Sequence, residues 1–163
     1  MQRRTLLAGT VGALVTAGCV PEGKVLQVSA PPNAPPARKI ERVLVWLPPQ
    51  DGLASAKLGD AFVSAFAPYG VPVRVGRANA LELNRGDDQT RLMNELQATH
   101  RLEVEVAYYR AGGSSPATLT LAVALYAGTS RTPLMTLSYR AGGLSDNSLA
   151  GVVVQTLRER GYL

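Results

Sequence analysis

Two stretches of the chain alternate between apolar residues and polar or small ones, and this alternation constrains the fold more than any other feature. The first runs from Leu102 to Tyr109 and the second from Thr118 to Leu125. Successive side chains of an extended strand point to opposite faces, so each stretch predicts a strand with one apolar face. A third strand-like run, Leu134 to Arg140, follows a turn sequence at residues 128–130. Together the three runs predict an antiparallel meander.

The region before the meander alternates strands with helices. Arg42 to Leu47 is a nearly continuous apolar run ended by two prolines, which predicts a strand buried on both faces. Val71 to Val75 predicts a second strand, parallel to the first through a right-handed helical crossover, and Pro72 favours either an edge position or the start of the strand. Apolar residues at helical spacing predict helices over 53–68 and over 86–99, and a last helix after Ser145, with Asp51, Asp87, Asp88 and Ser145 as candidate caps. This order, β-α-β-α-β-β-β-α, predicts an α/β sandwich with helices packed on a mixed sheet.

A single domain is expected over residues 40–163. The chain has 163 residues, of which 46% are hydrophobic and 18% charged, so it suffices for one core and falls short of two. Residues 19–39 contain five prolines and no sustained apolar periodicity, which predicts an extended spacer with a reach of about 60 Å. Two alternatives stay open: the spacer packs on its own domain, or Val25, Leu26 and Val28 add a short strand.

Residues 1–18 have the organisation of a bacterial export signal. Arg3 and Arg4 precede a weakly apolar run of 13 residues, Thr5 to Ala17, and small residues close it. The run is shorter than the roughly 20 residues that a membrane-spanning helix needs. The alternative, a buried first helix of the folded domain, is disfavoured because no cap precedes the run and a proline-rich segment follows it.

The end of this signal, Val15-Thr16-Ala17-Gly18-Cys19, resembles the lipobox of bacterial lipoproteins. Ala17 and Gly18 occupy its small positions, and Thr16 stands where the family usually has Leu. The resemblance implies that a peptidase cuts before Cys19, whose sulfur receives a diacylglycerol and which becomes the mature N-terminus. Such acyl chains hold a domain on a membrane without a helix. The alternative is an unlipidated secreted protein that is cut nearby.

The start of the signal also resembles a twin-arginine export signal, through Arg3, Arg4, one spacer residue and two leucines. That resemblance implies folding before export, and the general secretory route stays open beside it. Val20 after the lipidated cysteine implies the outer membrane, by the sorting preference of enteric lipoproteins. Removal of Arg3 and Arg4 lowers the formal net charge from +5 to +3, which gives no reason to expect a nucleic-acid partner.

The chain offers little material for catalysis or for cofactor and metal binding. It has one Cys and one His, which argues against a zinc site and a disulfide framework, and it contains no Walker, GxSxG, HExxH or GxGxxG motif. His100 is interpreted as a helix-end residue rather than a base or a ligand. Glu103 and Glu105 are interpreted as exposed carboxylates of a strand rather than an acid–base pair. No cofactor and no enzymatic activity are therefore expected.

Three further features carry weaker functional hypotheses. Trp46 is expected in the core, with the lining of a ligand pocket as the alternative. Arginines around the second helix are expected to form a solvated face, with binding of anionic lipid or glycan as the alternative. Tyr109-Arg110-Ala111-Gly112-Gly113 recurs at residues 139–143, which is interpreted as shared turn chemistry rather than a paired surface feature.

The element order over residues 40–163 resembles the small periplasmic domains of outer-membrane accessory lipoproteins. These families are the curli-secretion lipoprotein CsgG, the polysaccharide-export lipoprotein PelC, the penicillin-binding-protein activator LpoB and the N-terminal domain of TolB. The lipid anchor, the spacer and the missing catalytic set predict a non-catalytic accessory lipoprotein, held in the membrane through Cys19, that docks on an envelope assembly or export machine; whether it forms a homo-oligomer stays open. The alternative is a binding module for a small envelope ligand, lipid or glycan, with a groove near Trp46.

Overall fold

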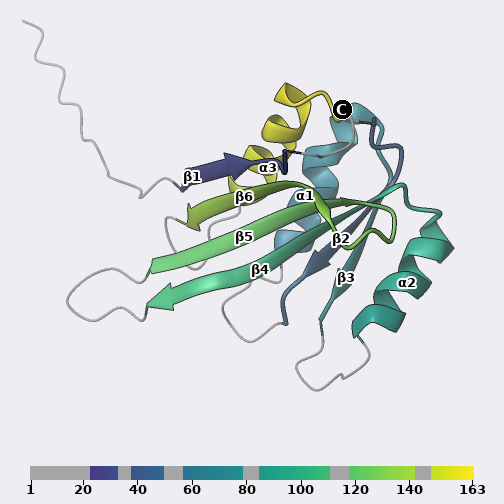
Figure 1. Ribbon diagram of the computed structural model, residues 1–163, viewed down its shortest axis with the longest axis horizontal. Coiled ribbons are helices and arrows are strands. Elements are labelled where there is room, and N and C mark those ends of the chain that lie inside the picture. Colours follow the sequence, from purple (N-terminus) through teal and green to yellow (C-terminus); the bar gives the residue numbers. More distant parts are fainter. Residues whose placement is uncertain (1–22, 33–37, 50–56, 79–84, 111–117, 142–147) are drawn as a thin grey trace, which may run out of the picture.

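The computed structural model describes residues 23–32, 38–49, 57–78, 85–110, 118–141 and 148–163. These residues form one mixed sheet of six strands with helices on both faces (Figure 1). In chain order the elements are β1 (Lys24–Ser29), β2 (Val43–Leu47), α1 (Leu58–Phe66), the short 3₁₀ helix η1 (Ala67–Tyr69), β3 (Val73–Arg77), α2 (Arg85–Leu96), β4 (His100–Arg110), β5 (Thr118–Ala127), β6 (Pro133–Ala141) and α3 (Ser148–Glu159).

The strands lie in the order β1-β6-β5-β4-β2-β3. β2 is parallel to both β3 and β4, whereas β4, β5, β6 and β1 are joined antiparallel. The expected α/β arrangement is therefore confirmed. The structure also confirms the antiparallel meander over β4, β5 and β6 and the parallel pairing of the first two expected strands. The strand that follows Pro72, β3, lies at an edge of the sheet.

One face of the sheet carries the main core, under α1 and α3. Alternate residues of β5 are buried, and they pack in one cluster with Phe62 and Phe66 of α1 and Leu149 and Leu157 of α3. β2 is the most enclosed strand, because all five of its residues are buried. Its alternation divides them between the two faces: Val43, Val45 and Leu47 join the main core, as predicted for a strand without a polar face.

A smaller cluster lies on the opposite face, under α2. Leu44 and Trp46 of β2 pack there against Met93 of α2. Trp46 is 2% exposed and is paired with Gly76 on β3. The expectation that Trp46 belongs to the core is confirmed.

β1 corrects the expectation that residues 19–39 are a spacer throughout. Lys24–Ser29 adds an edge strand beside β6, and Val25 and Val28 pack against the main core. The register shifts between Val25 and Gln27, so a bulge at Leu26 places both valines on the core face although they are three residues apart. The structure therefore has the added short strand that was the alternative for Val25, Leu26 and Val28.

The helices begin and end at other residues than the sequence predicts. The described part of the first helix starts at Leu58 after Lys57, which makes no side-chain cap, and the candidate caps Asp51 and Ser145 lie outside the described residues. Asp87 and Asp88 lie within the first turn of α2 rather than before it. α2 ends at Leu96 instead of Thr99 because Gln97 adopts a left-handed backbone with φ of 52°.

The two ends of the domain meet beside β2. The Ile40 amide donates a hydrogen bond of 2.8 Å to the carbonyl of Tyr162, and both side chains are buried. Among the described residues, no helix is long and apolar enough to cross a membrane.

Candidate docking surfaces

The face of the sheet that α2 occupies is covered only in part. α2 contacts β2 and β3, and no described helix packs on the same face of β5, β6 and β1. The side chains there are small or hydroxylated along much of each strand, and they are partly exposed: Thr118, Thr120, Ala122, Ala124, Thr136 and Ser138. Ser29 and Thr136 join β1 to β6 through a hydroxyl–hydroxyl hydrogen bond of 2.7 Å. The half-open meander expected from the alternation is present in the described chain.

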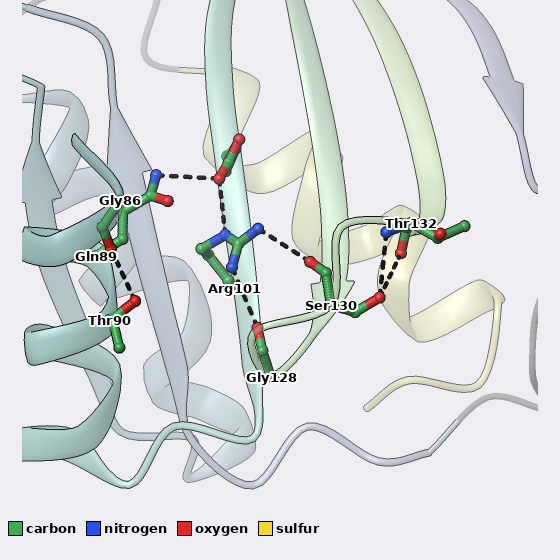
Figure 2. Close-up of polar contacts among 8 residues, drawn as sticks. Gly86, Gln89, Thr90, Arg101, Gly128, Ser130 and Thr132 are labelled. Atoms are coloured by element: carbon green, nitrogen blue, oxygen red, sulfur yellow. Dashed lines mark hydrogen bonds and ion pairs between the residues drawn. The ribbon is translucent and has the colours of Figure 1, made fainter. Parts of the chain in front are cut away.

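A polar network built on Arg101 borders this open face (Figure 2). The Arg101 Nε donates to Glu103 Oε1 at 2.7 Å, and its two terminal nitrogens donate to the carbonyls of Gly128 and Ser130 in the β5–β6 turn. Gln89 of α2 donates to the same Glu103 oxygen at 3.0 Å. The guanidinium also lies over the Tyr126 ring, 4.6 Å from its centroid. Arg101 thus links the β5–β6 turn to β4, and Glu103 links β4 to α2 through Gln89.

This network changes the interpretation of the glutamates on β4. The side chains of Arg101 and Glu103 are only 11% and 13% exposed, so their ion pair is largely withdrawn from water. Glu103 was expected to be a solvated carboxylate, and that expectation is wrong. Charge pairing with Arg101 and the hydrogen bond from the amide of Gln89 give Glu103 a structural role.

His100 also differs from its interpretation as a helix-end residue. It is the first residue of β4, is 3% exposed, and lies edge-on to the Tyr162 ring. Its Nδ1 lies 3.0 Å from the Thr99 hydroxyl, and its Nε2 has no partner among the described residues. Burial lowers the pKa of His100, and the nearby Glu41 carboxylate opposes this shift only in part. The imidazole is therefore neutral at pH 7 and is part of the core rather than an accessible base.

Two of the arginines around α2 have acidic partners. Arg91 forms ion pairs with Asp88 and Glu95 at 3.0 and 3.1 Å, and Arg101 is paired with Glu103. A small cavity of about 100 Å³ beside Arg74 is lined by Leu92, Glu95 and Leu96. It is well below the several hundred Å³ of a typical ligand site. Trp46, which the alternative of a ligand groove would place at the surface, is buried among the described residues.

A larger cleft of about 510 Å³ lies between η1 and the end of α3. Tyr69, Gln155, Arg158 and Glu159 line it, and Tyr69 is 39% exposed. Among the described residues, no three of His, Cys, Asp and Glu gather as a metal site would require. The residues that carry the expected export signal and lipid anchor, Arg3, Arg4, Ala17, Gly18 and Cys19, lie outside the described part of the chain.

The repeated Tyr-Arg sequence occupies two unlike environments. Tyr139 of β6 is fully buried and its hydroxyl is hydrogen-bonded to that of Ser148, whereas Tyr109 of β4 is 39% exposed. The neighbouring arginines, Arg110 and Arg140, are both exposed at the same end of the sheet. The two tyrosines do not form a pair, and the glycines that follow each motif lie outside the described residues.

Comparison with known proteins gives a match at the level of structure alone. No protein-family model matches the chain, and no curated protein sequence matches it. Two solved structures of the PelC dodecamer from Paraburkholderia phytofirmans are similar to it. One is a variant with a methionine substitution, with a TM-score of 0.52 and 14% identity; the other has a TM-score of 0.50 and 16% identity. Each comparison covers 86% of this chain and 99% of the PelC chain, so the two proteins share a fold over nearly the whole of PelC.

Proposed function

We propose that this chain is a lipid-anchored, non-catalytic lipoprotein of a bacterial envelope that assembles with copies of itself and docks on an export or assembly machine. The observation that carries the proposal is the combination of a lipobox-like sequence at Cys19 with the fold of PelC. The described residues support a non-catalytic role, because His100 is buried and Glu103 is held in an ion pair.

The anchor is assigned to the Cys19 sulfur. The chain has a single cysteine, which lies directly after small residues and a short apolar run. Arg3 and Arg4 direct export, and cleavage between Gly18 and Cys19 leaves the acylated cysteine as the first residue of the mature protein. Two or three acyl chains hold a protein stably at a membrane, since each buried methylene contributes about 0.8 kcal/mol. Val20 after the cysteine favours the outer membrane.

The spacer between this anchor and the sheet is short. β1 begins at Lys24, so only four residues separate it from Cys19. A fully extended chain covers at most about 3.6 Å per residue, which keeps Lys24 within about 18 Å of the cysteine. The folded domain is therefore held close to the membrane instead of at the end of a long spacer.

Self-association is proposed from the PelC likeness. The two PelC structures are dodecamers, and the present domain has the same fold. Its sheet ends in β1 and β3, and each of these edge strands has a described neighbour on one side only. Such edges, together with the partly uncovered face of β5 and β6, are surfaces on which a second protein chain can pack.

The lipid anchor is tested by fractionation of cells that produce the full chain. Wild-type protein should stay in the membrane pellet after a carbonate wash, and a density gradient should place it with the outer membrane. Cys19→Ser should move to the soluble fraction while its melting temperature stays that of the wild type. Retention of Cys19→Ser in the washed pellet would contradict the proposed anchor.

Self-association is tested separately on the purified chain that begins at Cys19, in detergent and at several concentrations. Light scattering coupled to gel filtration should give a mass that is a multiple of the monomer. Chemical cross-linking of wild-type cells should give a ladder of the same species. A monomer in both experiments would leave the anchor intact and would contradict the assembly part of the proposal.

A further inference from the structure

One end of the sheet gathers residues from four strands into a single row. Lys24 of β1 is paired with Arg140 of β6, Arg140 with Thr120 of β5, and Thr120 with Tyr108 of β4. Three inter-strand steps of about 4.8 Å separate the first strand of this row from the last, so the row is about 14 Å wide. Figure 1 shows the start of β1 and the ends of β6 and β4 on the same side of the sheet.

The tip of β4 projects beyond its parallel neighbour. β2 is paired with β4 only from His100 to Glu103, and the remaining residues of β4 continue along β5 alone. The last four residues of β4 are all exposed, with Tyr108 at 54% and Tyr109 at 39%. Because neighbouring residues of a strand point to opposite faces, this tip presents one tyrosine on each face of the sheet.

The described strand ends at this side of the sheet carry positive charge. Lys24, Arg110 and Arg140 are exposed there, and the paired strand ends Lys24–Val25, Tyr108–Arg110, Thr118–Thr120 and Tyr139–Ala141 contain no aspartate or glutamate. Exposed tyrosine rings beside lysine and arginine are typical of protein surfaces at the boundary between lipid headgroups and water.

The anchor leads away from this end and not from the opposite one. β1 runs from Lys24 at the row to Ser29, which is paired with Thr136 farther along β6. The four residues between Cys19 and Lys24 leave at most about 18 Å between the cysteine and the row. A lipid on Cys19 therefore holds the tyrosines and the cations within reach of the headgroups.

We propose that the sheet end formed by Lys24, Tyr108, Tyr109, Arg110 and Arg140 is a membrane-contact surface that binds anionic phospholipid headgroups. This inference rests on the proposed anchor at Cys19 for its orientation, and it assigns the side of the domain that faces the bilayer. The opposite end carries Tyr69, the β5–β6 turn and the cleft along α3, and it faces the periplasm, where a partner protein reaches it.

The surface is tested by co-sedimentation of the Cys19→Ser chain that begins at residue 19 with lipid vesicles. This chain keeps every element that the structure describes and carries no acyl group. Vesicles of phosphatidylglycerol and phosphatidylcholine in equal parts should bind it, and vesicles of phosphatidylcholine alone should bind it far less. Added salt should release it, because headgroup attraction is screened within a Debye length.

Substitutions at the row should weaken this binding. Arg110→Gln with Arg140→Gln should lower the partition coefficient about 25-fold, since each cation near an anionic surface accounts for about a fivefold change. Tyr108→Ser with Tyr109→Ser should lower it as well, and it should do so also at high salt, where the charge contribution is small. Both pairs are exposed, so their melting temperatures should match that of the wild type.

Matched controls lie at the opposite end of the sheet. Tyr69 has the same 39% exposure as Tyr109, and Arg131 is an exposed cation in the β5–β6 turn. Tyr69→Ser with Arg131→Gln should leave vesicle binding unchanged. An equal loss in this control would overturn the proposed surface, because binding would then not depend on the end of the sheet at which the residues lie. An unchanged affinity of both row variants would overturn it as well.

A second measurement uses the single cysteine to impose the anchor. The chain that begins at Cys19 is coupled through its thiol to a maleimide lipid in the same vesicles, and amide hydrogen exchange is followed. Exchange should slow at Tyr108–Arg110 relative to the uncoupled chain and should stay the same at residues 128–132. Equal exchange at both places would contradict the orientation. Neither experiment depends on acylation in the cell, so failure of the anchor and failure of the surface are distinguishable.

Discussion

The indole ring of Trp46 lies directly on the backbone of Gly76, its partner in the parallel register of β2 and β3. A Cβ atom added at Gly76 would come within 2.5 Å of the Trp46 Cε3 atom and within 3.1 Å of a methyl group of Leu92. The absence of a side chain at this one position lets α2 and the tryptophan close over the edge of the sheet. The sequence contains the glycine, but only the register between two strands shows what it accommodates.

Gly76→Ala should therefore lower the free energy of unfolding by about 1–3 kcal/mol, because the added methyl group overpacks the cluster of Leu44, Trp46 and Met93. Gly151→Ala is the control, since nothing lies within 4 Å of a Cβ there and the residue is exposed in α3. That change should stabilise the protein by about 0.5–1 kcal/mol. Thermal melts of both variants measure the difference, and equal stability of the two would contradict the close approach.

The two faces of β5 should respond differently to a carboxylate. Leu121 is 5% exposed and belongs to the main core, whereas Thr120 points to the face that α2 leaves uncovered. Leu121→Asp should unfold the domain, because an unpaired buried carboxylate costs several kcal/mol. Thr120→Asp should cost less than about 1 kcal/mol. Circular dichroism melts compare them; similar damage by both changes would mean that another chain or segment covers this face.

Removal of β1 should destabilise the domain, although its segment reads as a spacer in the sequence. A chain that begins at Ala30 loses the pairing with β6 and the partial burial of Val25 and Val28, and it should lose about 2 kcal/mol, or roughly 6 °C in melting temperature. A chain that begins at Gly23 keeps β1 and should have the same melting temperature as the chain that begins at Cys19. Equal melting temperatures for all three chains would mean that β1 does not stabilise the fold.

Stability should fall in mild acid because of His100. Burial lowers its pKa in the folded state, so between that value and the unfolded value of about 6.5 the unfolded chain binds more protons than the folded one. The contribution of the neutral imidazole is fully present above about pH 6.5 and is lost progressively as the pH falls below it. Melting temperatures at pH 7.5 and 5.5 should differ more for the wild type than for His100→Gln. If the melting temperature falls by the same amount between pH 7.5 and pH 5.5 in both proteins, titratable groups other than His100 cause the loss of stability.

Strict alternation made β4 and β5 predictable, and it failed for β1 for a physical reason. The bulge at Leu26 places Val25 and Val28, which are three residues apart, on one face, and this breaks the two-residue alternation of a regular strand. The flanking prolines then favour a spacer. The strand forms because β6 offers an unpaired edge, and that edge is set by the long-range order of the sheet.

In the candidate sites too, contacts between residues close in sequence were predictable and contacts between distant segments were not. Arg101 and Glu103 are opposite charges two residues apart on one strand face, so their ion pair had a local signal. Gln89 lies 14 residues before Glu103, and the carbonyls of the β5–β6 turn lie at least 27 residues after Arg101. No local sequence pattern predicts these two sets of contacts. His100 was interpreted as a helix-end residue because no glycine marks the end of α2 in the sequence. The helix ends instead before Gln97, whose backbone is left-handed.

The row of Lys24, Arg140, Thr120 and Tyr108 has no counterpart in the sequence pattern. Its members come from four strands, and their neighbourhood depends on two bulges, at Leu26 and between Val106 and Tyr108. The repeated Tyr-Arg sequence was interpreted as shared turn chemistry, with a paired surface feature of Tyr109 and Tyr139 as the alternative. The register instead joins Arg140 to Tyr108 through Thr120, which moves the surface feature to other residues.

Both the proposed anchoring and the proposed orientation depend on the lipid at Cys19, and the intact mass of the protein extracted from washed membranes tests that lipid most directly. The spectrum should give a chain that begins at Cys19 and carries the added mass of a diacylglyceryl group, and treatment that hydrolyses the ester-linked acyl chains should remove their part of that mass. A chain that retains Met1 to Gly18, or one that begins near Cys19 with an unmodified thiol, would contradict it.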